Sequence, residues 1–380
     1  MEEKSIFKVS KNTLLHSLQN VAKVVSDKSS LPIYTTIMFK VEDGKLFLTG
    51  SNQEIQIETS LELIEVSSPV KFCMDKTVIG ILKTLSEQPL TVEVVKTTEE
   101  KKAVTINVNI IHAAGNVEIQ AMDAVDFTKM IETDGKTFTM PVENLKRGLN
   151  KTRKFAQNDP SYPTASAVYM DILPDRLVFV ATNNKVVSVF KDLSLTGIDA
   201  NSFIFGIAAV NTTVSLLNEA TEELAVITSS KGAISINIGD ITITSRLVEG
   251  KYVKYDSVIP KVNPVNFTTE SKQLSNTVSR LLAASDNMVG LIRIEADPEK
   301  VNLSTKDEYY NKSANENIPA MCNGAITIGA KGSHLEDMLS VIDGNVILSF
   351  STPERPIIIA PETNEDKTEL TLLAMPLSLQ

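Results

Sequence analysis

Six times along this chain, an apolar residue at the end of a strand-like stretch is followed by mainly apolar residues at helical spacing. After Phe7, for example, Leu14, Leu18 and Val21 lie seven, eleven and fourteen positions later. This pattern predicts a strand that leads directly into a helix with one buried face. The six copies begin, in chain order, at Phe7, Phe72, Phe138, Phe203, Phe267 and Ile328, and the second copy is slipped by one residue.

The copies fall into three pairs. Phe7, Phe138 and Phe267 open the pairs and are 131 and 129 residues apart. Strand-like segments outnumber helical ones, so we expect an α+β fold in which each of three similar domains packs two helices on antiparallel sheets. Repetition of this kind builds an extended or closed architecture whose function depends on its shape. The expected domains are residues 1–133, 134–261 and 262–380.

Composition favours a soluble cytoplasmic protein. The chain has 380 residues and 42% hydrophobic residues, which is enough for a core in each of three domains. It has no run of about 18 apolar residues, and its first residues do not have the form of a signal peptide, so no membrane partner is expected. Cys73 and Cys322 are isolated in the sequence, which suits a reducing compartment.

One predicted helix is unusually basic for a chain of net charge −10. That net charge argues against coating nucleic acid by bulk attraction, so any DNA contact must be local or geometric. In the helix expected from about Val142 to Ala156, five of the ten residues from Leu145 to Lys154 are basic, and they lie beside or opposite the apolar stripe. These residues are Lys146, Arg147, Lys151, Arg153 and Lys154.

The corresponding helix faces of other repeats carry His16, Lys23, Lys272 and Arg280. An ordinary solvated helix surface is one interpretation of such residues. Their recurrence on equivalent faces favours a surface that presents sparse positive charge to phosphates. Such contacts would be independent of DNA sequence, because Lys and Arg on phosphates position DNA without reading bases.

Signals of catalysis are weak throughout the chain. The sequence contains no GxGxxG, HExxH, CxxC or GxSxG motif. Its three histidines, His16, His112 and His334, are far apart and stand at no metal-ligand spacing. We therefore expect no enzyme activity, no cofactor and no metal site.

The segment from Ile243 to Lys261, which reads ITSRLVEGKYVKYDSVIPK, resembles the signature that closes the second domain of the bacterial DNA polymerase III beta subunit, the sliding clamp. Four further segments resemble that family in the order in which the family has them, and together they span all three domains. They are Leu31–Ile33, Asp43–Leu46, Ala124–Phe127 and Ala374–Leu377.

The resemblance implies a head-to-tail homodimer that forms a closed, pseudo-sixfold ring of six similar domains, with helices lining the hole. Such a ring encircles duplex DNA and tethers the replicative polymerase, and an ATP-driven clamp loader opens it. Lys28 is an inner-helix residue by resemblance alone, since periodicity puts it just past the first helix. The candidate DNA-lining residues are Lys23, Lys28, Lys83, Lys146, Arg147, Lys151, Arg153, Lys154, Lys272 and Arg280.

The resemblance also implies an apolar pocket between the second and third domains. In the family it binds polymerase, loader and repair proteins through short peptides with Gln, Leu and Phe anchors. Where the family commonly has Thr-Asp-Gly-His-Arg-Leu, this chain has TNNKVV from Thr182, and Val253 replaces a common Pro, so the peptide preference is left open. The candidate pocket residues are Thr182, Asn184, Lys185, Val186, Val187, Val253, Ser257, Val258, Leu373, Met375, Pro376 and Leu377.

Two other classes of protein share parts of this pattern. A repeat scaffold that does not form a ring would have similar composition, but it would have no reason for recurring basic helix faces. A conventional DNA-binding protein would explain the basic helix, yet it would bind linear DNA directly and would usually carry net positive charge.

Overall fold

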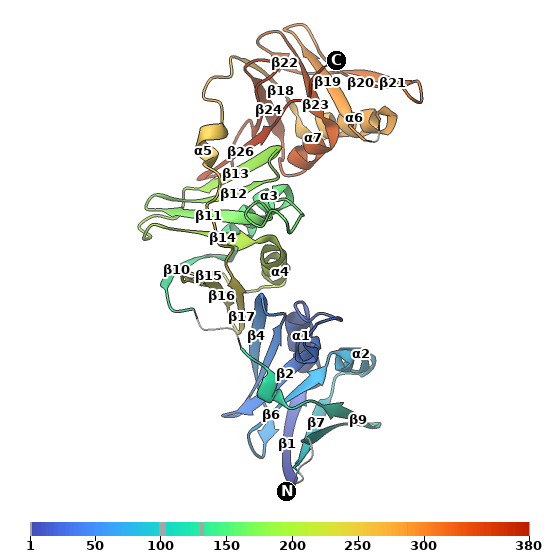
Figure 1. The fold of residues 1–380 in the computed structure, drawn as a ribbon, viewed down its shortest axis with the longest axis vertical. Helices are drawn as coiled ribbons and strands as arrows, with labels where there is room; N and C mark the ends of the chain where they lie inside the picture. The colour runs from blue at the N-terminus through green and yellow to red at the C-terminus, as the bar shows by residue number, and fades with distance from the viewer. Residues whose placement is uncertain (1, 99–103, 130–132, 287, 380) are drawn as a thin grey trace. The chain divides into compact units, whose positions relative to one another are not determined.

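The structure is a computed structural model that describes residues 2–98, 104–129, 133–286 and 288–379 (Figure 1). It has the predicted α+β fold, in which antiparallel sheets dominate. By its internal contacts the chain divides into two compact units. Unit 1 comprises Met1–Val142 and Ser215–Leu247, and unit 2 comprises Glu143–Val214 and Val248–Gln380. This division cuts through the second predicted domain, so the three domain boundaries remain a prediction.

Unit 1 contains a five-stranded sheet, in the order β5-β1-β7-β8-β9, and an eight-stranded sheet, in the order β10-β15-β16-β17-β4-β3-β2-β6. Its first elements are β1 (Glu2–Ser10), α1 (Lys11–Ala22), the 3-10 helix η1 (Pro32–Thr35), β2 (Thr36–Glu42), β3 (Lys45–Ser51), β4 (Ile55–Glu62), β5 (Glu65–Val66), β6 (Val70–Asp75) and α2 (Thr77–Thr84). The others are β7 (Pro89–Thr97), β8 (Thr105–His112), β9 (Gly115–Ala121), the 3-10 helix η2 (Ala124–Asp126), β10 (Lys136–Pro141), β15 (Leu224–Ser229), β16 (Ala233–Ile238) and β17 (Ile241–Arg246).

Unit 2 contains a nine-stranded sheet, in the order β14-β11-β12-β13-β26-β25-β24-β18-β22, and a four-stranded sheet, in the order β21-β20-β19-β23. The division between the units falls within two helices, after the first residue of α3 (Val142–Thr152) and before the last three residues of α4 (Ile207–Leu217). The elements from the second repeat are the 3-10 helix η3 (Arg153–Phe155), β11 (Ala167–Leu173), β12 (Arg176–Thr182), β13 (Val186–Asp192), β14 (Asn201–Gly206) and α5 (Tyr255–Val258). The remaining elements are β18 (Val265–Glu270), α6 (Ser271–Ala284), β19 (Leu291–Ala296), β20 (Val301–Asp307), β21 (Lys312–Ile318), β22 (Met321–Cys322), β23 (Ile326–Lys331), α7 (Gly332–Leu339), β24 (Asn345–Phe350), β25 (Ile357–Pro361) and β26 (Thr368–Ala374).

The strand-then-helix prediction is confirmed at all six copies, where α1, α2, α3, α4, α6 and α7 follow the predicted strands. In α1 the periodic residues Leu14, Leu18 and Val21 are buried, because they face the sheet. The basic helix is shorter than predicted: α3 ends at Thr152 and continues as the tighter η3. The inner-helix position of Lys28 is wrong, since α1 ends at Ala22 and Lys28 lies in an exposed loop.

We call each pair of copies a repeat, so the first, second and third repeats open with Phe7, Phe138 and Phe267. Consecutive repeats are joined by strand pairing, and we call each such strand pair a seam. In unit 1, the fourth strand of the first repeat, β4, pairs with the last strand of the second repeat, β17. In unit 2, the fourth strand of the second repeat, β13, pairs with the last strand of the third repeat, β26. The strands that correspond to these partners, β9 in the first repeat and β21 in the third, each end a sheet within the described part of the chain.

Candidate functional site

The basic side chains of α3 are bound to acidic and carbonyl groups of the last repeat in unit 2. The Arg147 guanidinium lies 3.0 Å from a carboxylate oxygen of Glu365. The Lys151 ammonium lies 3.7 Å from the other Glu365 oxygen and donates to the carbonyl of Val341 over 2.7 Å. Glu365 therefore compensates the charge of two residues predicted to face phosphates.

The end of α3 and η3 make a second set of contacts. The Lys154 ammonium lies 2.9 Å from a carboxylate oxygen of Asp337 and 3.1 Å from the hydroxyl of Ser340. The Arg153 guanidinium donates to the amide oxygens of Asn150 and Asn211 over 3.0 and 2.9 Å. These groups surround a hollow of about 550 Å³. The remaining cation of the set, Lys146, pairs with Glu143 one turn earlier over 3.4 Å.

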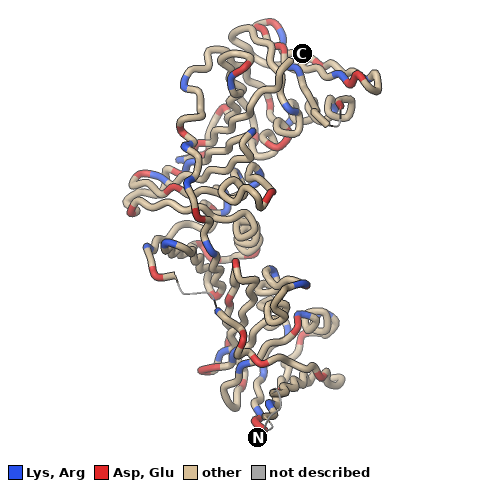
Figure 2. The backbone as a smooth tube through the Cα atoms, in the orientation of Figure 1, with Lys and Arg blue, Asp and Glu red and all other residues tan. Residues whose placement is uncertain are grey.

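The predicted basic surface is therefore a mixed one. Figure 2 shows both signs of charge scattered over each unit. Sequence pattern did not reveal Glu365 and Asp337, because they lie more than 180 residues after α3 and only the fold brings them to it. Phosphates that approach α3 must compete with these carboxylates, and exposed pairs of this kind contribute only up to about 1 kcal/mol each.

In unit 1 the predicted cations line a hollow of about 680 Å³ between α1, α2 and the end of α4. Lys23 pairs there with Glu219 over 2.8 Å. Lys83 lines the same hollow and, among the described residues, has no ion pair or hydrogen bond of its side chain. Lys28 is not among the residues that line this hollow. Its loop is held by hydrogen bonds of its own backbone with the Ser26 hydroxyl.

The third repeat places its two predicted cations differently. Lys272 is exposed in the first turn of α6. Arg280 forms a two-pronged pair with Glu316 of β21, with distances of 2.8 and 2.7 Å. This pairing raises the pKa of Arg280 and, through the same hydrogen bonds, lowers the pKa of Glu316. Arg280 therefore anchors the edge strand β21 rather than pointing freely into solvent.

An apolar cluster in unit 2 brings together the three segments of the predicted peptide pocket. It contains Val178, Val180, Val187, Val189, Tyr255, Ile358 and Leu373. β13 and β26 supply its floor, where Val187 pairs with Leu373. Val253, Val258 and Met375 are exposed beside it. A buried apolar cluster with exposed apolar side chains beside it therefore lies where the peptide pocket is predicted, and the pocket itself stays a prediction.

Two tyrosines that were not among the predicted residues hold the closing segment against the sheet. Tyr252 stacks on Tyr169 with ring centroids 4.8 Å apart, and its hydroxyl donates to the carbonyl of Val180 over 3.3 Å. The Tyr255 hydroxyl donates to a carboxylate oxygen of Asp171 over 2.9 Å. Burial raises the pKa of both phenols, and the bond to Asp171 adds to the effect at Tyr255. Their spacing of three residues in an otherwise polar segment was the signal that could have revealed them.

The C-terminal tail is fixed by its backbone beside this cluster. The amide of Met375 donates to the carbonyl of Lys185 over 2.8 Å, and the amide of Leu377 donates to the carbonyl of Gly329 over 2.8 Å. Pro376 lies between these two bonds and is partly buried. The tail is therefore held by its backbone to the β12–β13 turn and to β23.

Not every predicted pocket residue faces the apolar cluster. Val186 is buried, and because side chains alternate along a strand it points to the opposite face from Val187. The Thr182 hydroxyl is also buried and donates to the carbonyl of Val186, which closes the β12–β13 turn. Asn184 and Lys185 are exposed at the tip of that turn, and Ser257 is exposed on α5.

Within the ranges that the structure describes, no group of His, Cys, Asp and Glu side chains is arranged to hold a metal ion. In the same ranges, no helix is both long and apolar enough to cross a membrane.

Comparison with known proteins identifies one family, whose models match the two ends of the chain and together cover more than half of it. Family models match residues 5–131 as the DNA polymerase III beta subunit, N-terminal domain, and residues 256–377 as its C-terminal domain. The beta sliding clamp of Pseudomonas aeruginosa is 24% identical over 378 residues, covering 97% of this chain and 99% of that protein. The beta sliding clamp of Bacillus subtilis is 21% identical, covering 96% of this chain and 98% of that protein.

Solved structures agree with the fold. The sliding clamp from Pseudomonas aeruginosa bound to griselimycin has a TM-score of 0.90 at 21% identity, with 99% of this chain and 100% of that chain covered. The sliding clamp from Bacillus subtilis has a TM-score of 0.90 at 20% identity, with both chains covered completely. The repeat, the seams and these matches lead to one conclusion: the chain belongs to the DNA polymerase III beta subunit family, the beta sliding clamps.

Proposed function

We propose that this protein is a non-catalytic DNA sliding clamp of the cytoplasm. Two copies would join head to tail into a ring around duplex DNA and tether the replicative polymerase and repair proteins. A clamp loader would open the ring. The observation that carries the proposal is the pair of equivalent seams, which leaves a matching pair of strand edges at β9 and β21.

The seams have the same register in both units. In each repeat, a series of residues that pair across neighbouring strands can be followed from the opening residue to the last strand. It runs Phe138–Ile227–Ile236–Ile243, Phe267–Leu348–Ile359–Leu372 and, in the first repeat, Phe7–Val92–Ile110–Val117. Ile243 pairs across its seam with Ile57, and Leu372 pairs across its seam with Ser188. Val117 is thus the counterpart of the two residues that form the seams from this side.

The other side of each seam can be traced in the same way. The partners run Phe72–Phe39–Leu48–Thr59, Phe203–Met170–Phe179–Phe190 and Ile328–Ile294–Leu303–Glu316. Ile57 and Ser188 stand two residues before Thr59 and Phe190, so their counterpart in β21 is Ala314. A ring closed by the same geometry would pair Ala314 of one copy with Val117 of the next.

A closed ring also accounts for the charge of the chain. A protein of net charge −10 has no bulk attraction to DNA, and the α3 cations are already paired. Retention would come from topology, because a ring cannot leave a circular duplex without opening. The apolar cluster with Met375 at its rim would then hold peptides with Gln, Leu and Phe anchors from partner proteins.

The test is retention on nicked circular DNA after loading by the cognate clamp loader with ATP, followed by linearisation of the same DNA. We expect the protein to stay on the circle and to be lost rapidly from free ends. Equal binding to circle and line would show direct contact instead. No binding to either form, with a loader proved active on another clamp, would favour a scaffold that does not encircle DNA.

Replacing Arg147, Lys151 and Lys154 with Ala is expected to weaken retention and to flatten its salt dependence. The change removes three cations and leaves the carboxylates of Glu365 and Asp337 without partners beside DNA. Each phosphate contact contributes about 0.9 to the slope of log K against log salt, so the slope should fall by about that amount per lost contact. The measurement is residence time on circular DNA from low to high salt.

The matched control removes the same charges from the sheets of unit 2, where Arg176 pairs with Asp175 and Lys191 with Glu369. A variant with Arg176, Lys191 and Lys300 all replaced by Ala should retain the wild-type salt dependence. If the α3 variant behaves like this control at every salt concentration, the α3 cations do not line the DNA path.

A further inference from the structure

The β20–β21 turn carries an exposed aromatic pair that its counterparts lack. The equivalent turns of the first and second repeats have three residues each, 52–54 between β3 and β4 and 183–185 between β12 and β13. The β20–β21 turn has four residues, 308–311. Tyr309 is 87% exposed and Tyr310 is 65% exposed. Their rings meet edge to face with centroids 4.8 Å apart. Two adjacent tyrosines held in contact with each other but with solvent around them are typical of an interaction surface.

The counterpart turns are both held at a seam by one equivalent hydrogen bond. In unit 1, the amide of Arg246 donates to the carbonyl of Glu54 over 3.0 Å. In unit 2, the amide of Met375 donates to the carbonyl of Lys185 over 2.8 Å. Each donor lies three residues after the seam residue of its own strand, Ile243 or Leu372, and each acceptor lies three residues before the seam residue of the partner strand, Ile57 or Ser188.

The same count fixes what the β20–β21 turn would meet in a closed ring. Three residues after Val117 is Gln120, and three residues before Ala314 is Asn311. The amide of Gln120 in one copy would therefore face the carbonyl of Asn311 in the other. The two tyrosines directly precede Asn311, so this contact directs them onto the segment that follows β9.

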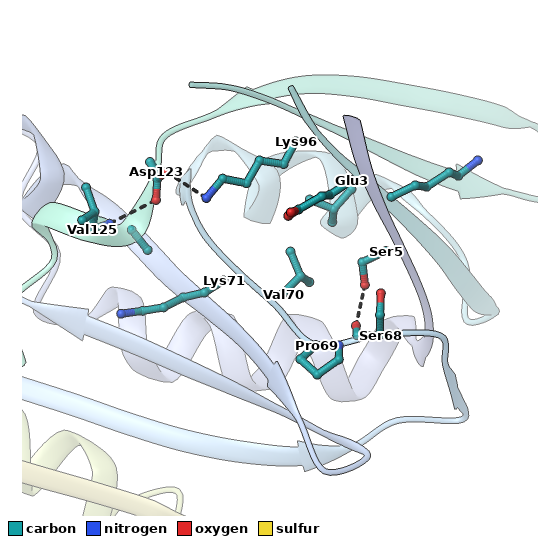
Figure 3. A pocket seen from close by; sticks show the side chains of 12 residues that line it. Glu3, Ser5, Ser68, Pro69, Val70, Lys71, Lys96, Asp123 and Val125 are labelled. Carbon is teal, nitrogen blue, oxygen red and sulfur yellow. Dashed lines mark hydrogen bonds and ion pairs between the residues drawn. The ribbon is translucent and has the colours of Figure 1, made fainter. Parts of the chain in front are cut away.

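That segment presents a matching surface. Met122 is 43% exposed and Val125 is 80% exposed, on either side of Asp123. Val125 lines a cleft of about 660 Å³, together with Val70, Lys71, Lys96 and Asp123 among others, and Met122 directly precedes Asp123 in the chain. Figure 3 shows Lys96 reaching Asp123, while Lys71 extends from β6 without a drawn partner. The cleft thus combines an apolar rim with a cation, Lys71, that can donate a hydrogen bond to a phenol oxygen.

We propose that Tyr309 and Tyr310 form an aromatic latch that seats on the Met122–Val125 rim of a second copy of this chain. This inference rests on the proposed ring. The aromatic rings of the two tyrosines bury apolar area against Met122 and Val125, and a tyrosine hydroxyl accepts a hydrogen bond from Lys71. The third repeat has the longer turn because its seam is the one that forms between separate chains, where no covalent connection holds the strands together.

The test is a double-mutant cycle on the dimer. The variant Tyr309→Ser with Tyr310→Ser is expected to raise the dimer dissociation constant about 30-fold or more, since buried tyrosines commonly contribute about 2 kcal/mol at an interface. Val125→Asp should cause a similar loss from the other side. Because both changes remove the same contact, their combination should cost much less than the product of the two effects. Sedimentation at graded concentrations measures each dissociation constant.

Tyr162→Ser is the matched control, since Tyr162 is an exposed tyrosine elsewhere in unit 2, and it should leave the dimer unchanged. Thermal unfolding of each variant separates weakened assembly from a damaged fold. If the wild type is retained on circles but the tyrosine variant dimerises like the wild type, or if the two losses multiply fully, the latch is wrong and the ring stands. If the wild type neither dimerises nor stays on circles, the ring itself is wrong.

Discussion

Oxidation of a variant carrying Val117→Cys and Ala314→Cys is expected to convert the protein into a covalently closed ring of two chains. The register derived from the seams puts these residues directly opposite each other across the closure between copies. Opposed residues of antiparallel strands have Cα atoms about 4.5–5.5 Å apart, which lies within the range that a disulfide spans. The product should run as a dimer on a non-reducing gel.

The native thiols should not compete with this reaction. Cys73 is buried, and burial raises the pKa of its thiol to about 12, so almost no reactive thiolate forms near neutral pH. Cys322 is partly exposed and donates to the carbonyl of Gly324, so Cys322→Ser keeps a donor there and removes the thiol. The same background serves every variant in the series.

The decisive readout uses circular DNA. When the cysteine pair is oxidised after loading, the ring should remain on the circle in detergent, and cutting the DNA should release it. Either cysteine alone should give no covalent dimer. The shifted pair Glu118→Cys with Ala314→Cys should cross-link poorly, because neighbouring residues of a strand point to opposite faces. Efficient cross-linking of the shifted pair alone would show that the register differs from that of the internal seams.

Deletion of Met375–Gln380 is expected to abolish binding of partner peptides while the dimer persists. The deletion removes Met375 and Leu377, which are two of the predicted pocket residues. Losing two apolar anchors worth about 1.5 kcal/mol each lowers affinity about 100-fold. β26 ends at Ala374 and keeps all seven of its residue pairs with β13, so the seam should survive. Fluorescence polarisation with a labelled peptide that carries Gln, Leu and Phe anchors measures the loss.

Met375→Ser provides a milder companion to the deletion, because it removes one exposed anchor and keeps both backbone hydrogen bonds of the tail. It should weaken the peptide by about tenfold, as expected for one anchor. Dissociation of the dimer by the deletion would show that the tail is structural. Full peptide affinity after the deletion would place the binding site elsewhere.

Local pattern predicted the helices because burial of one face leaves a periodic trace in the sequence. Leu14, Leu18 and Val21 are buried as their spacing indicates. The same kind of information could not end α3 at Thr152. Periodicity did place Lys28 just past the first helix, as the structure has it, and only the resemblance had put this residue on an inner helix. Helix ends depend on where the following chain must go, and a few tenths of a kcal/mol of propensity do not decide that.

Contacts between distant segments left no local trace. The compensation of Arg147 by Glu365 joins residues more than 200 positions apart, and neither residue is unusual in its own segment. Val186 and Val187 are chemically alike in the sequence, and only the pairing of β13 with β26 determines which of them faces the apolar cluster. The resemblance to a family supplied the set of pocket residues, whereas the strand register sorted it.

The ion pairs of α3 bear on friction. A cation that is free in solution binds the nearest phosphate, and a ring lined with such cations would rest in a deep energy well at each step along the duplex. Where Glu365 and Asp337 already hold Arg147, Lys151 and Lys154, a passing phosphate only exchanges one anionic partner for another. The wells become shallow and closely spaced, so a clamp built in this way would diffuse rapidly along DNA while the closed ring keeps it there.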